Sequence, residues 1–420
     1  MKSTLSFLDK LTCSLSLLFA LDRLAKLAAV IHFFHRPAPS QLEVWPTVTL
    51  LQPITRGANA LAESLRARAR LDYPASIQHL FICDTRDTES QSIVQTFLAA
   101  HPMLRAEIVL VETGDAAVAS KIRKLQAALS RANGEILCFM DDDVAPRPDA
   151  LRVVLPYLYR PGAGAAFGLP CYTNWRTPWS SLMSGLVNAN MLLSFVALTY
   201  LAEPFRITGH IAAFRRDIFL DVGGLDGLEQ HIDDDFEMAR RLRAHGLRSV
   251  QTPLVYDIDN ELLSPAAYQA QLKRWFVLPR QAMMPSLSPW ERVVTLLTSS
   301  ALPLPSIVAL LALMTRRRAA FLALGVSLGI FGIVYGVCEA RYLKGRTPLT
   351  RWPLLLLGAL LTPLQIGRAL LSNDVVEWRG QRLRVYRNGT VEVKASPSAP
   401  SPCNGEGAEG EASVRQDQRR

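Results

Sequence analysis

The hydrophobic positions divide this chain into two parts with different patterns. Before residue 290 the apolar runs are short and alternate with segments of helical spacing, whereas after residue 290 the apolar runs are long. The short runs are predicted strands at residues 48–51, 79–83, 107–111 and 135–140. Helices are predicted at residues 59–70 and 121–133, and Gly134 is expected to end the second one. Strands that alternate with helices predict an α/β domain whose parallel sheet is covered on both faces.

Three long apolar segments predict membrane-spanning helices. Residues 293–314 and 319–338 contain no charged side chain, and residues 352–371 contain only Arg368. A helix rises ~1.5 Å per residue, so about 20 residues cross a hydrocarbon core of ~30 Å. We therefore expect an integral membrane protein with its transmembrane helices at residues 291–372.

The N-terminal segment, residues 1–45, leaves two alternatives open. Residues 11–34 are apolar overall, but Asp22, Arg23 and Lys26 lie in the middle. A charge at the centre of a spanning helix costs ~2.5–3.5 kcal/mol, so spanning is disfavoured unless these charges pair. The segment is either a membrane anchor or a helix that lies in the membrane interface.

An uncharged run at residues 178–202 lies inside the α/β part and contains Trp179 and Tyr200. It is either core or a segment that contacts the membrane. Because aromatic side chains favour the headgroup region, we expect membrane contact.

The charge of the chain points to a membrane surface. Lys and Arg number 46 and Asp and Glu 37, a net charge of +9. No basic stripe is interleaved with aromatic residues, so nucleic acid is not an expected partner. Many cations instead flank the apolar segments, where they favour anionic lipid. Residues 396–420 are rich in Ser, Pro, Gly and charge and are predicted to be disordered.

The first candidate site is a triplet of aspartates, Asp141-Asp142-Asp143, directly after the predicted strand 135–140. Asp84 follows another predicted strand. In parallel sheets ligands bind beyond the carboxyl ends of the strands, so these carboxylates lie where a ligand is expected. Because neighbouring carboxylates repel, a metal ion with a polyphosphate is their natural complement.

Two further segments have both a structural and a functional interpretation. Asp234 and Asp235 begin a helical pattern, where they either favour the helix dipole or supply a general base. Residues 271–275 contain Gln271, Arg274 and Trp275 just before the long apolar runs. They form either an interfacial anchor or a site in which Arg274 binds a diphosphate and Trp275 forms a pocket wall.

The order and spacing of short motifs is more specific than any one of them. The motifs span residues 46–393 and are Leu71-Asp72-Tyr73-Pro74, Asp84-Thr85-Arg86-Asp87, Lys121, Asp141-Asp142-Asp143-Val144, Gly168-Leu169-Pro170, Ile207-Thr208-Gly209, Asp234-Asp235, Gln271 to Trp275, and Trp378-Arg379-Gly380 with Arg384. Together they resemble the ceramide glucosyltransferase family of membrane-bound glycosyltransferases.

The resemblance implies a GT-A domain, which is an α/β nucleotide-sugar domain, at residues 46–290 and a short C-terminal motif segment at residues 373–395. It implies transfer of a hexose, most directly glucose from a UDP-sugar donor, to the primary hydroxyl of a ceramide-like lipid acceptor with inversion. The catalytic domain would then face the cytosol, where UDP-sugars are found. Alternatives are a hopanoid or polyprenoid lipid or a polysaccharide as acceptor, or a membrane protein that binds nucleotide-sugar or lipid without turnover.

The resemblance also implies a role for individual residues. Asp235 would be the catalytic base, and Asp141 and Asp143 would hold Mg²⁺ or Mn²⁺ against the diphosphate. The remaining residues implied to bind substrate are Asp84 and Asp87 around the uridine and ribose, Lys121, Asp234, Gln271, Arg274 and Trp275.

Overall fold

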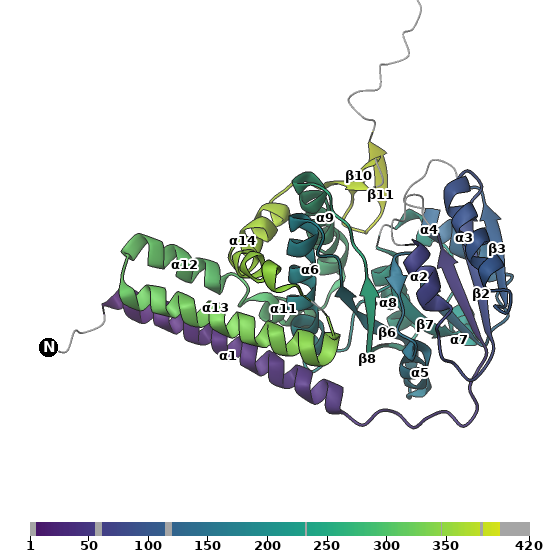
Figure 1. Ribbon diagram of the computed structural model, residues 1–420, viewed down its shortest axis with the longest axis horizontal. Helices are drawn as coiled ribbons and strands as arrows, with labels where there is room; N and C mark the ends of the chain where they lie inside the picture. Colours follow the sequence, from purple (N-terminus) through teal and green to yellow (C-terminus); the bar gives the residue numbers. More distant parts are fainter. Residues whose placement is uncertain are drawn as a thin grey trace, which may run out of the picture.

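The computed structural model describes residues 6–54, 61–113, 120–231, 233–345, 347–378 and 381–394. An α/β domain adjoins a group of long helices, and a small second sheet lies beside both (Figure 1). The tail predicted to be disordered, residues 396–420, and the Arg379-Gly380 pair lie outside the described residues.

The central sheet has eight strands in the order β3-β2-β1-β4-β7-β6-β8-β5. Its strands are β1 (Val48–Pro53), β2 (Ile77–Asp84), β3 (Ala106–Val111), β4 (Ile136–Met140), β5 (Val144–Ala145), β6 (Ala163–Tyr172), β7 (Ile211–Arg215) and β8 (Arg248–Ile258). The first four strands are parallel as predicted, but β7 is antiparallel to both β4 and β6. The sheet is therefore mixed, and the expectation of a wholly parallel sheet was wrong.

Helices cover both faces of this sheet, as the alternation along β2 shows. Phe81 and Cys83 pack with α2 (Leu61–Arg68) and α3 (Thr88–Ala100), whereas Leu80 and Ile82 pack with α4 on the other face. The remaining helices of the domain are α4 (Ser120–Leu129), α5 (Ala150–Val154), α6 (Pro178–Met191), α7 (Arg216–Asp221), α8 (Asp234–Ala244) and α9 (Pro265–Leu278).

The prediction for Gly134 was wrong, because α4 ends at Leu129 and Gly134 does not cap it. A Cβ at Gly134 would lie 2.5 Å from the backbone nitrogen of Thr49. Glycine therefore serves here to let the chain pass close to β1.

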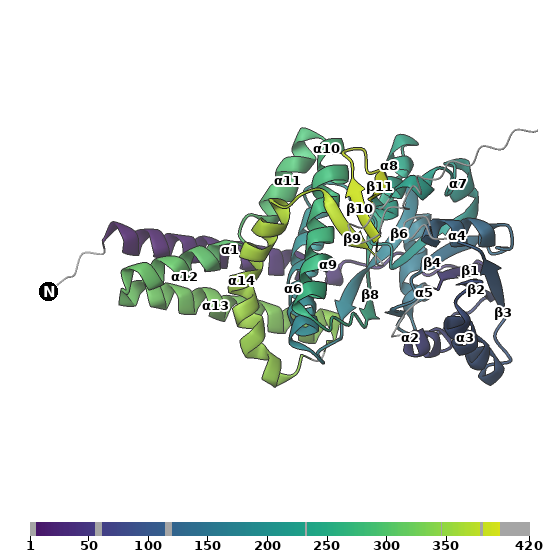
Figure 2. The same ribbon diagram turned by 90° about the horizontal axis from the view of Figure 1, so that it is seen from above.

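Three helices of the membrane-directed part lie side by side: α1 (Phe7–His35), α12 (Leu304–Thr315) and α13 (Arg318–Cys338) (Figures 1 and 2). Arg317 pairs with Asp9 near the start of α1, and Phe34 stacks on Tyr342 near its end. The helices α1 and α13 therefore run parallel. We call α1, α12 and α13 the bundle.

The charges in the middle of α1 are paired. The Asp22 carboxylate lies 2.6 Å from the Arg23 guanidinium and 2.8 Å from the Lys26 ammonium group. Lys26 Nζ also donates to the carbonyl oxygen of Thr298, 2.7 Å away. The charges are therefore paired, but α1 is not among the described helices that are long and apolar enough to cross a membrane.

The apolar run 293–314 is not one helix. It is divided between α11 (Pro289–Ser299) and α12, which are bent by 47° at the break between Ser299 and Leu304, as a broken span or a re-entrant loop. In the described residues, Arg318–Leu343 and Leu349–Leu370 are long and apolar enough to cross a membrane, and the bent pair is a third candidate.

The helix α14 (Trp352–Leu370) crosses the direction of the bundle in both views (Figures 1 and 2). It packs against α6 and α9 of the α/β domain.

Most side chains of α6 are buried, so residues 178–191 correspond to the core alternative and not to the expected membrane contact. Beside α9 lies the small antiparallel sheet of β9 (Val375–Trp378), β10 (Gln381–Val385) and β11 (Val391–Lys394).

Candidate active site

The predicted aspartates lie at one edge of the central sheet. Asp84 ends β2 and Asp141 follows β4, and both strands are parallel to β1 between them. Neighbouring strands are ~4.8 Å apart, so these two backbones lie about 10 Å from one another. The antiparallel β7 brings His210 to the same edge, where its carbonyl oxygen accepts from the Asp141 backbone N–H, 3.1 Å away.

The loop of three aspartates is held by its backbone. The buried Arg68 of α2 donates to the carbonyl oxygen of Asp141, and Ser64 Oγ donates to that of Asp142 at 2.6 Å. Burial lowers the pKa of Arg68 to about 10, although Asp142, Asp143 and Asp141 act to raise it. Both hydrogen bonds use backbone carbonyl oxygens of the loop and not its carboxylates.

Lys121 joins the two acidic clusters that the sequence singled out separately. Its Nζ lies 3.2 Å from Asp141 Oδ1 and 3.1 Å from Asp234 Oδ2. Burial acts to lower the pKa of Lys121, but Asp141, Asp234 and Asp235 outweigh it and raise that pKa well above its ordinary value. A permanently cationic amine therefore lies between the aspartate loop and the first turn of α8.

Asp235 is oriented by the backbone of Gly209. The Gly209 N–H donates to Asp235 Oδ2 at 3.0 Å, and a Cβ at Gly209 would lie only 1.8 Å from Asp235 Oδ1. Burial raises the pKa of Asp235 to about 8, with repulsion from Asp234 as the next cause. Asp233, directly before these two aspartates, caps α8 through Oδ1, which accepts from the Phe236 N–H at 3.2 Å.

The carboxylates of Asp141 and Asp143 fit a hard divalent cation. Burial raises the pKa of Asp143 to about 7, and repulsion from Asp142 and Asp141 adds to the increase. A cation would relieve this repulsion. The part of the chain that the structure describes contains no cluster of three His, Cys, Asp or Glu residues for a metal. Two carboxylates with phosphate oxygens and waters are a common arrangement for Mg²⁺.

Asp84 and Asp87 lie beside the end of β2. Asp84 accepts from the Arg86 N–H at 2.9 Å and from the Thr113 hydroxyl. Burial acts to raise the pKa of Asp84, but these hydrogen bonds outweigh it and lower that pKa. Asp87 caps α3 through Oδ1, which accepts from the Ser90 N–H at 3.1 Å, while its buried Oδ2 has no hydrogen-bond partner among the described residues.

One face of α9 reaches the aspartate loop through Tyr172, at the end of β6. Trp275 contacts the Tyr172 ring edge-on, with ring centroids 6.1 Å apart. Burial raises the pKa of Tyr172, and the negative charge of Asp143 adds to the effect. Arg274 lies over the Trp378 ring at 4.6 Å, and Gln271 accepts from Asn260 at 3.3 Å. The structure thus brings Gln271, Arg274 and Trp275 to the edge of the site and adds the C-terminal sheet as a neighbour.

The sequence profile of glycosyl transferase family 21 matches residues 11–391, most of the chain. The chain belongs to this family. The resemblance predicted from the sequence is confirmed, because the family profile covers most of the chain. The predicted fold class, an α/β domain followed by long apolar helices, is confirmed by the structure.

Relatives of this family 21 glycosyltransferase have names that refer to lipids. A beta-monoglucosyldiacylglycerol synthase of Synechocystis sp. is 24% identical over 342 residues, 74% of this chain and 67% of the relative. A ceramide glucosyltransferase of Gibberella zeae is 30% identical over 152 residues, 33% of this chain and 29% of the relative. Among solved structures, a mannosyltransferase from Pyrobaculum calidifontis in complex with GDP-Man and Mn²⁺ aligns with a TM-score of 0.46 and 20% identity, covering 80% of this chain and 99% of that chain.

Two residues beside the candidate site were not predicted from the sequence. His210 has a buried Nδ1 without a hydrogen-bond partner in the described residues, and burial lowers the pKa of its ring. Its position directly after the Ile207-Thr208-Gly209 motif is the sequence signal that could have indicated it. Arg68 is the second, and nothing in its sequence surroundings distinguishes it from an exposed helical arginine.

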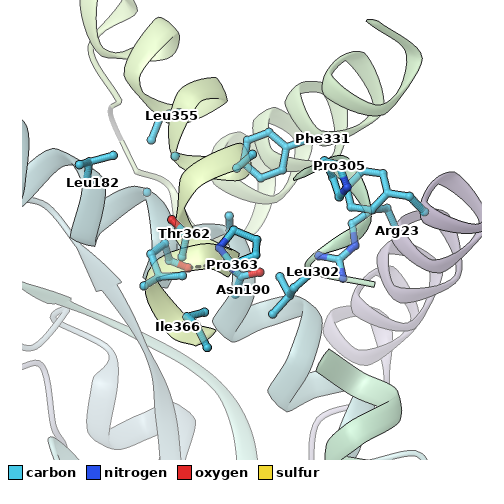
Figure 3. Close-up of a pocket in the computed structure, with 16 residues that line it drawn as sticks. Arg23, Leu182, Asn190, Leu302, Pro305, Phe331, Leu355, Thr362, Pro363 and Ile366 are labelled. Atoms are coloured by element: carbon cyan, nitrogen blue, oxygen red, sulfur yellow. Dashed lines mark hydrogen bonds between the residues drawn. The ribbon is translucent and has the colours of Figure 1, made fainter. Parts of the chain in front are cut away.

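A mostly apolar cavity lies between the bundle, α6 and α14 (Figure 3). Its apolar lining includes Leu182, Phe331 and Leu355, and Figure 3 shows Arg23, Asn190 and Thr362 as its polar members. The opposite side of α6 carries Asn188, whose amide group exchanges two hydrogen bonds with the Tyr172 backbone at 2.8 and 2.9 Å. The helix α6 therefore separates this cavity from the aspartate site.

Proposed function

We propose that this glycosyltransferase transfers glucose from UDP-glucose to the primary hydroxyl of a two-chain membrane lipid. The observation that carries the proposal is the single site in which Lys121 joins Asp141 to Asp234 beside the oriented carboxylate of Asp235. The names of the two relatives support the lipid, since diacylglycerol and ceramide both offer a primary hydroxyl and two hydrocarbon chains.

The donor half of the proposed site is the aspartate loop. Asp141 and Asp143 would hold Mg²⁺ or Mn²⁺, which supplies positive charge against the departing diphosphate. Asp84 and Asp87 would lie around the ribose and uridine, since they are at the same sheet edge and Asp87 keeps one buried oxygen without a partner in the described chain. Arg274 would add a planar cation for phosphate oxygens.

Asp235 is the proposed general base. Its carboxylate takes the proton of the acceptor hydroxyl while that oxygen forms a bond to the anomeric carbon. The bond from this carbon to the diphosphate oxygen breaks at the same time, UDP leaves, and the anomeric configuration inverts. A raised pKa makes Asp235 a stronger proton acceptor than an ordinary carboxylate.

The cavity of Figure 3 is the proposed place for a hydrocarbon chain of the acceptor. Its lining is mostly apolar, and it lies on the bundle side of α6, whose other side is bonded to Tyr172. A lipid whose chains are held there would present its hydroxyl near the membrane edge of the aspartate site. The α/β domain would face the cytosol, because UDP-sugars are made there.

The test is transfer of labelled glucose by the purified full chain in lipid vesicles. Vesicles containing diacylglycerol and vesicles containing ceramide are each incubated with labelled UDP-glucose, and extracted lipids are separated and counted. We expect a labelled glycolipid with at least one acceptor and none with the Asp235→Asn variant. Protein that binds UDP-glucose but labels neither lipid would refute the proposed acceptor class.

A further inference from the structure

A second cavity lies on the side of α9 that faces away from the aspartate site. It has a volume of about 410 Å³ and is bounded by α9, the C-terminal end of α14, and the strands β9 and β10. On α9 it is lined by Ala266, Gln269 and Lys273, which share one face of the helix. Gln271 and Trp275 lie on the other face, so α9 forms a wall between this cavity, which we call the basic groove, and the active site.

Cations outnumber anions in the basic groove. Its lining contains Lys273, Arg368 and Arg382, against the single carboxylate of Glu377. Burial lowers the pKa of Lys273, Glu377 offsets part of this effect, and Arg382 adds to it. The lining of the groove therefore carries a net positive charge.

Contacts between side chains hold the walls of the basic groove, and one of them uses Lys273, whose Nζ donates to Asn373 Oδ1 at 2.7 Å. Tyr268 donates to Gln365 Oε1 at 2.8 Å and joins α9 to α14. The nearby Asp374 carboxylate pairs with Arg280, 2.5 Å away, and raises the pKa of Lys273 less than Glu377 does. The side chains of Arg368 and Arg382 are exposed.

An exposed apolar stripe on α14 leads to this groove. Arg368 continues a helical series with spacings of three and four residues, and the apolar members of the series are Leu357, Leu361, Leu364 and Leu371. These leucines are exposed, Leu364 by 64% and Leu371 by 89%. Because α14 crosses the direction of the bundle, its stripe would lie along the membrane surface when the bundle spans the membrane (Figure 2). Leucines beside an arginine are suited to hydrocarbon chains beside a headgroup.

We propose that the basic groove binds the headgroup of an anionic phospholipid, with its acyl chains along the leucine stripe of α14. Lys273, Arg368 and Arg382 are placed to contact the phosphate. This ligand is distinct from donor and acceptor, and its site lies on the opposite face of α9 from Gln271 and Trp275. A bound lipid would fix α9 against α14 and so favour the position of the active-site face. The binding claim does not depend on the proposed function, but this activating effect rests on it.

The direct test measures binding of dioctanoyl-phosphatidylglycerol to the detergent-solubilised full chain by calorimetry. The groove variant carries Lys273→Gln, Arg368→Gln and Arg382→Gln. The matched control removes the same charge at exposed positions of the α/β domain with Arg105→Gln, Arg131→Gln and Arg160→Gln. We expect the groove variant to bind ~10-fold more weakly or worse, and the control to bind like the wild type.

Several results would overturn the site. One is binding of the lipid by the groove variant as tight as by the wild type. Another is binding of dioctanoyl-phosphatidylcholine by the wild type as tight as that of dioctanoyl-phosphatidylglycerol. The third is binding of inorganic phosphate as tight as that of the lipid, which would assign the groove to a free anion. Arg368→Gln alone changes one exposed side chain, and a several-fold loss is expected for it if the triple variant does not fold.

Activation is measured separately in phosphatidylcholine vesicles with and without phosphatidylglycerol. We expect phosphatidylglycerol to raise glucosyl transfer by the wild type and the control but not by the groove variant. Equal activation of the groove variant would overturn the effect on α9. Absence of transfer in every vesicle would instead count against the proposed function, while the calorimetry still decides the binding site.

Discussion

The contact between Gly209 and Asp235 gives a sharp prediction for the base. In Gly209→Ala the new Cβ would lie 1.8 Å from Asp235 Oδ1, 2.4 Å from its Cγ and 2.5 Å from Oδ2. The carboxylate must then move away by more than about 1 Å, and displacements of this size cost ~10²-fold in rate. The hydrogen bond from the Gly209 N–H, 3.0 Å long, would be lost or distorted as well.

We expect Gly209→Ala to lower kcat by ~10²-fold or more while the KM for the donor changes little. Steady-state kinetics with labelled UDP-glucose and a vesicle-borne lipid acceptor measure both values. Gly329→Ala is the matched control, since no heavy atom lies within 4 Å of a Cβ at that position, and it should keep its activity.

A double variant separates the role of Gly209 from general damage. If Gly209 acts through the base, Gly209→Ala should add little further loss when Asp235→Asn has already removed that base. Near-normal kcat in Gly209→Ala would refute the reasoning. The same ~10²-fold loss on both backgrounds would show that Gly209 acts elsewhere.

Three further predictions concern metal, proton and topology. Excess chelator should abolish transfer, and Asp143→Ala should abolish the binding of UDP-glucose measured by calorimetry. Full activity in excess chelator would contradict the assignment of Asp141 and Asp143 as metal ligands. Since only the ionised Asp235 accepts a proton, kcat should rise with pH until about 8 and then level, and a flat profile below that pH would contradict the assigned base. Met103 is 95% exposed, so a cysteine at this position should be labelled by an impermeant reagent only after cells are permeabilised. A cysteine at Arg316 should be labelled in intact cells. Labelling of Met103→Cys in intact cells would contradict the cytosolic position of the α/β domain.

The four parallel strands followed from the sequence because each is a short apolar run, and predicted helices separate the first from the second and the third from the fourth. The antiparallel β7 did not, since its five residues Ile211–Arg215 carry no sign of strand direction. The role of Gly134 was hidden for a similar reason, because the backbone it approaches, at Thr49, lies 85 residues away. Local pattern therefore predicted the elements, and long-range contacts decided their pairing.

The candidate site was predictable as residue types and not as a geometry. Both acidic clusters and Lys121 were singled out, but only the structure shows that one amine contacts both of them. The support of the aspartate loop by Arg68 was not predictable, since a buried arginine in α2 has the same helical pattern as an exposed one. In the membrane part, the sequence showed the charges of α1 but not that Lys26 reaches Thr298.

The stereochemistry of the product tests the central claim most directly. UDP-glucose is an α-glycoside, so a single displacement assisted by Asp235 must give a β-linked glycolipid. The lipid made by the wild type from carbon-13-labelled UDP-glucose should therefore show a β-anomeric signal in NMR, and Asp235→Asn should make ~10²–10⁴-fold less of it per unit time. An α-linked product, or a β-linked product formed equally fast by Asp235→Asn, would contradict direct displacement at this site.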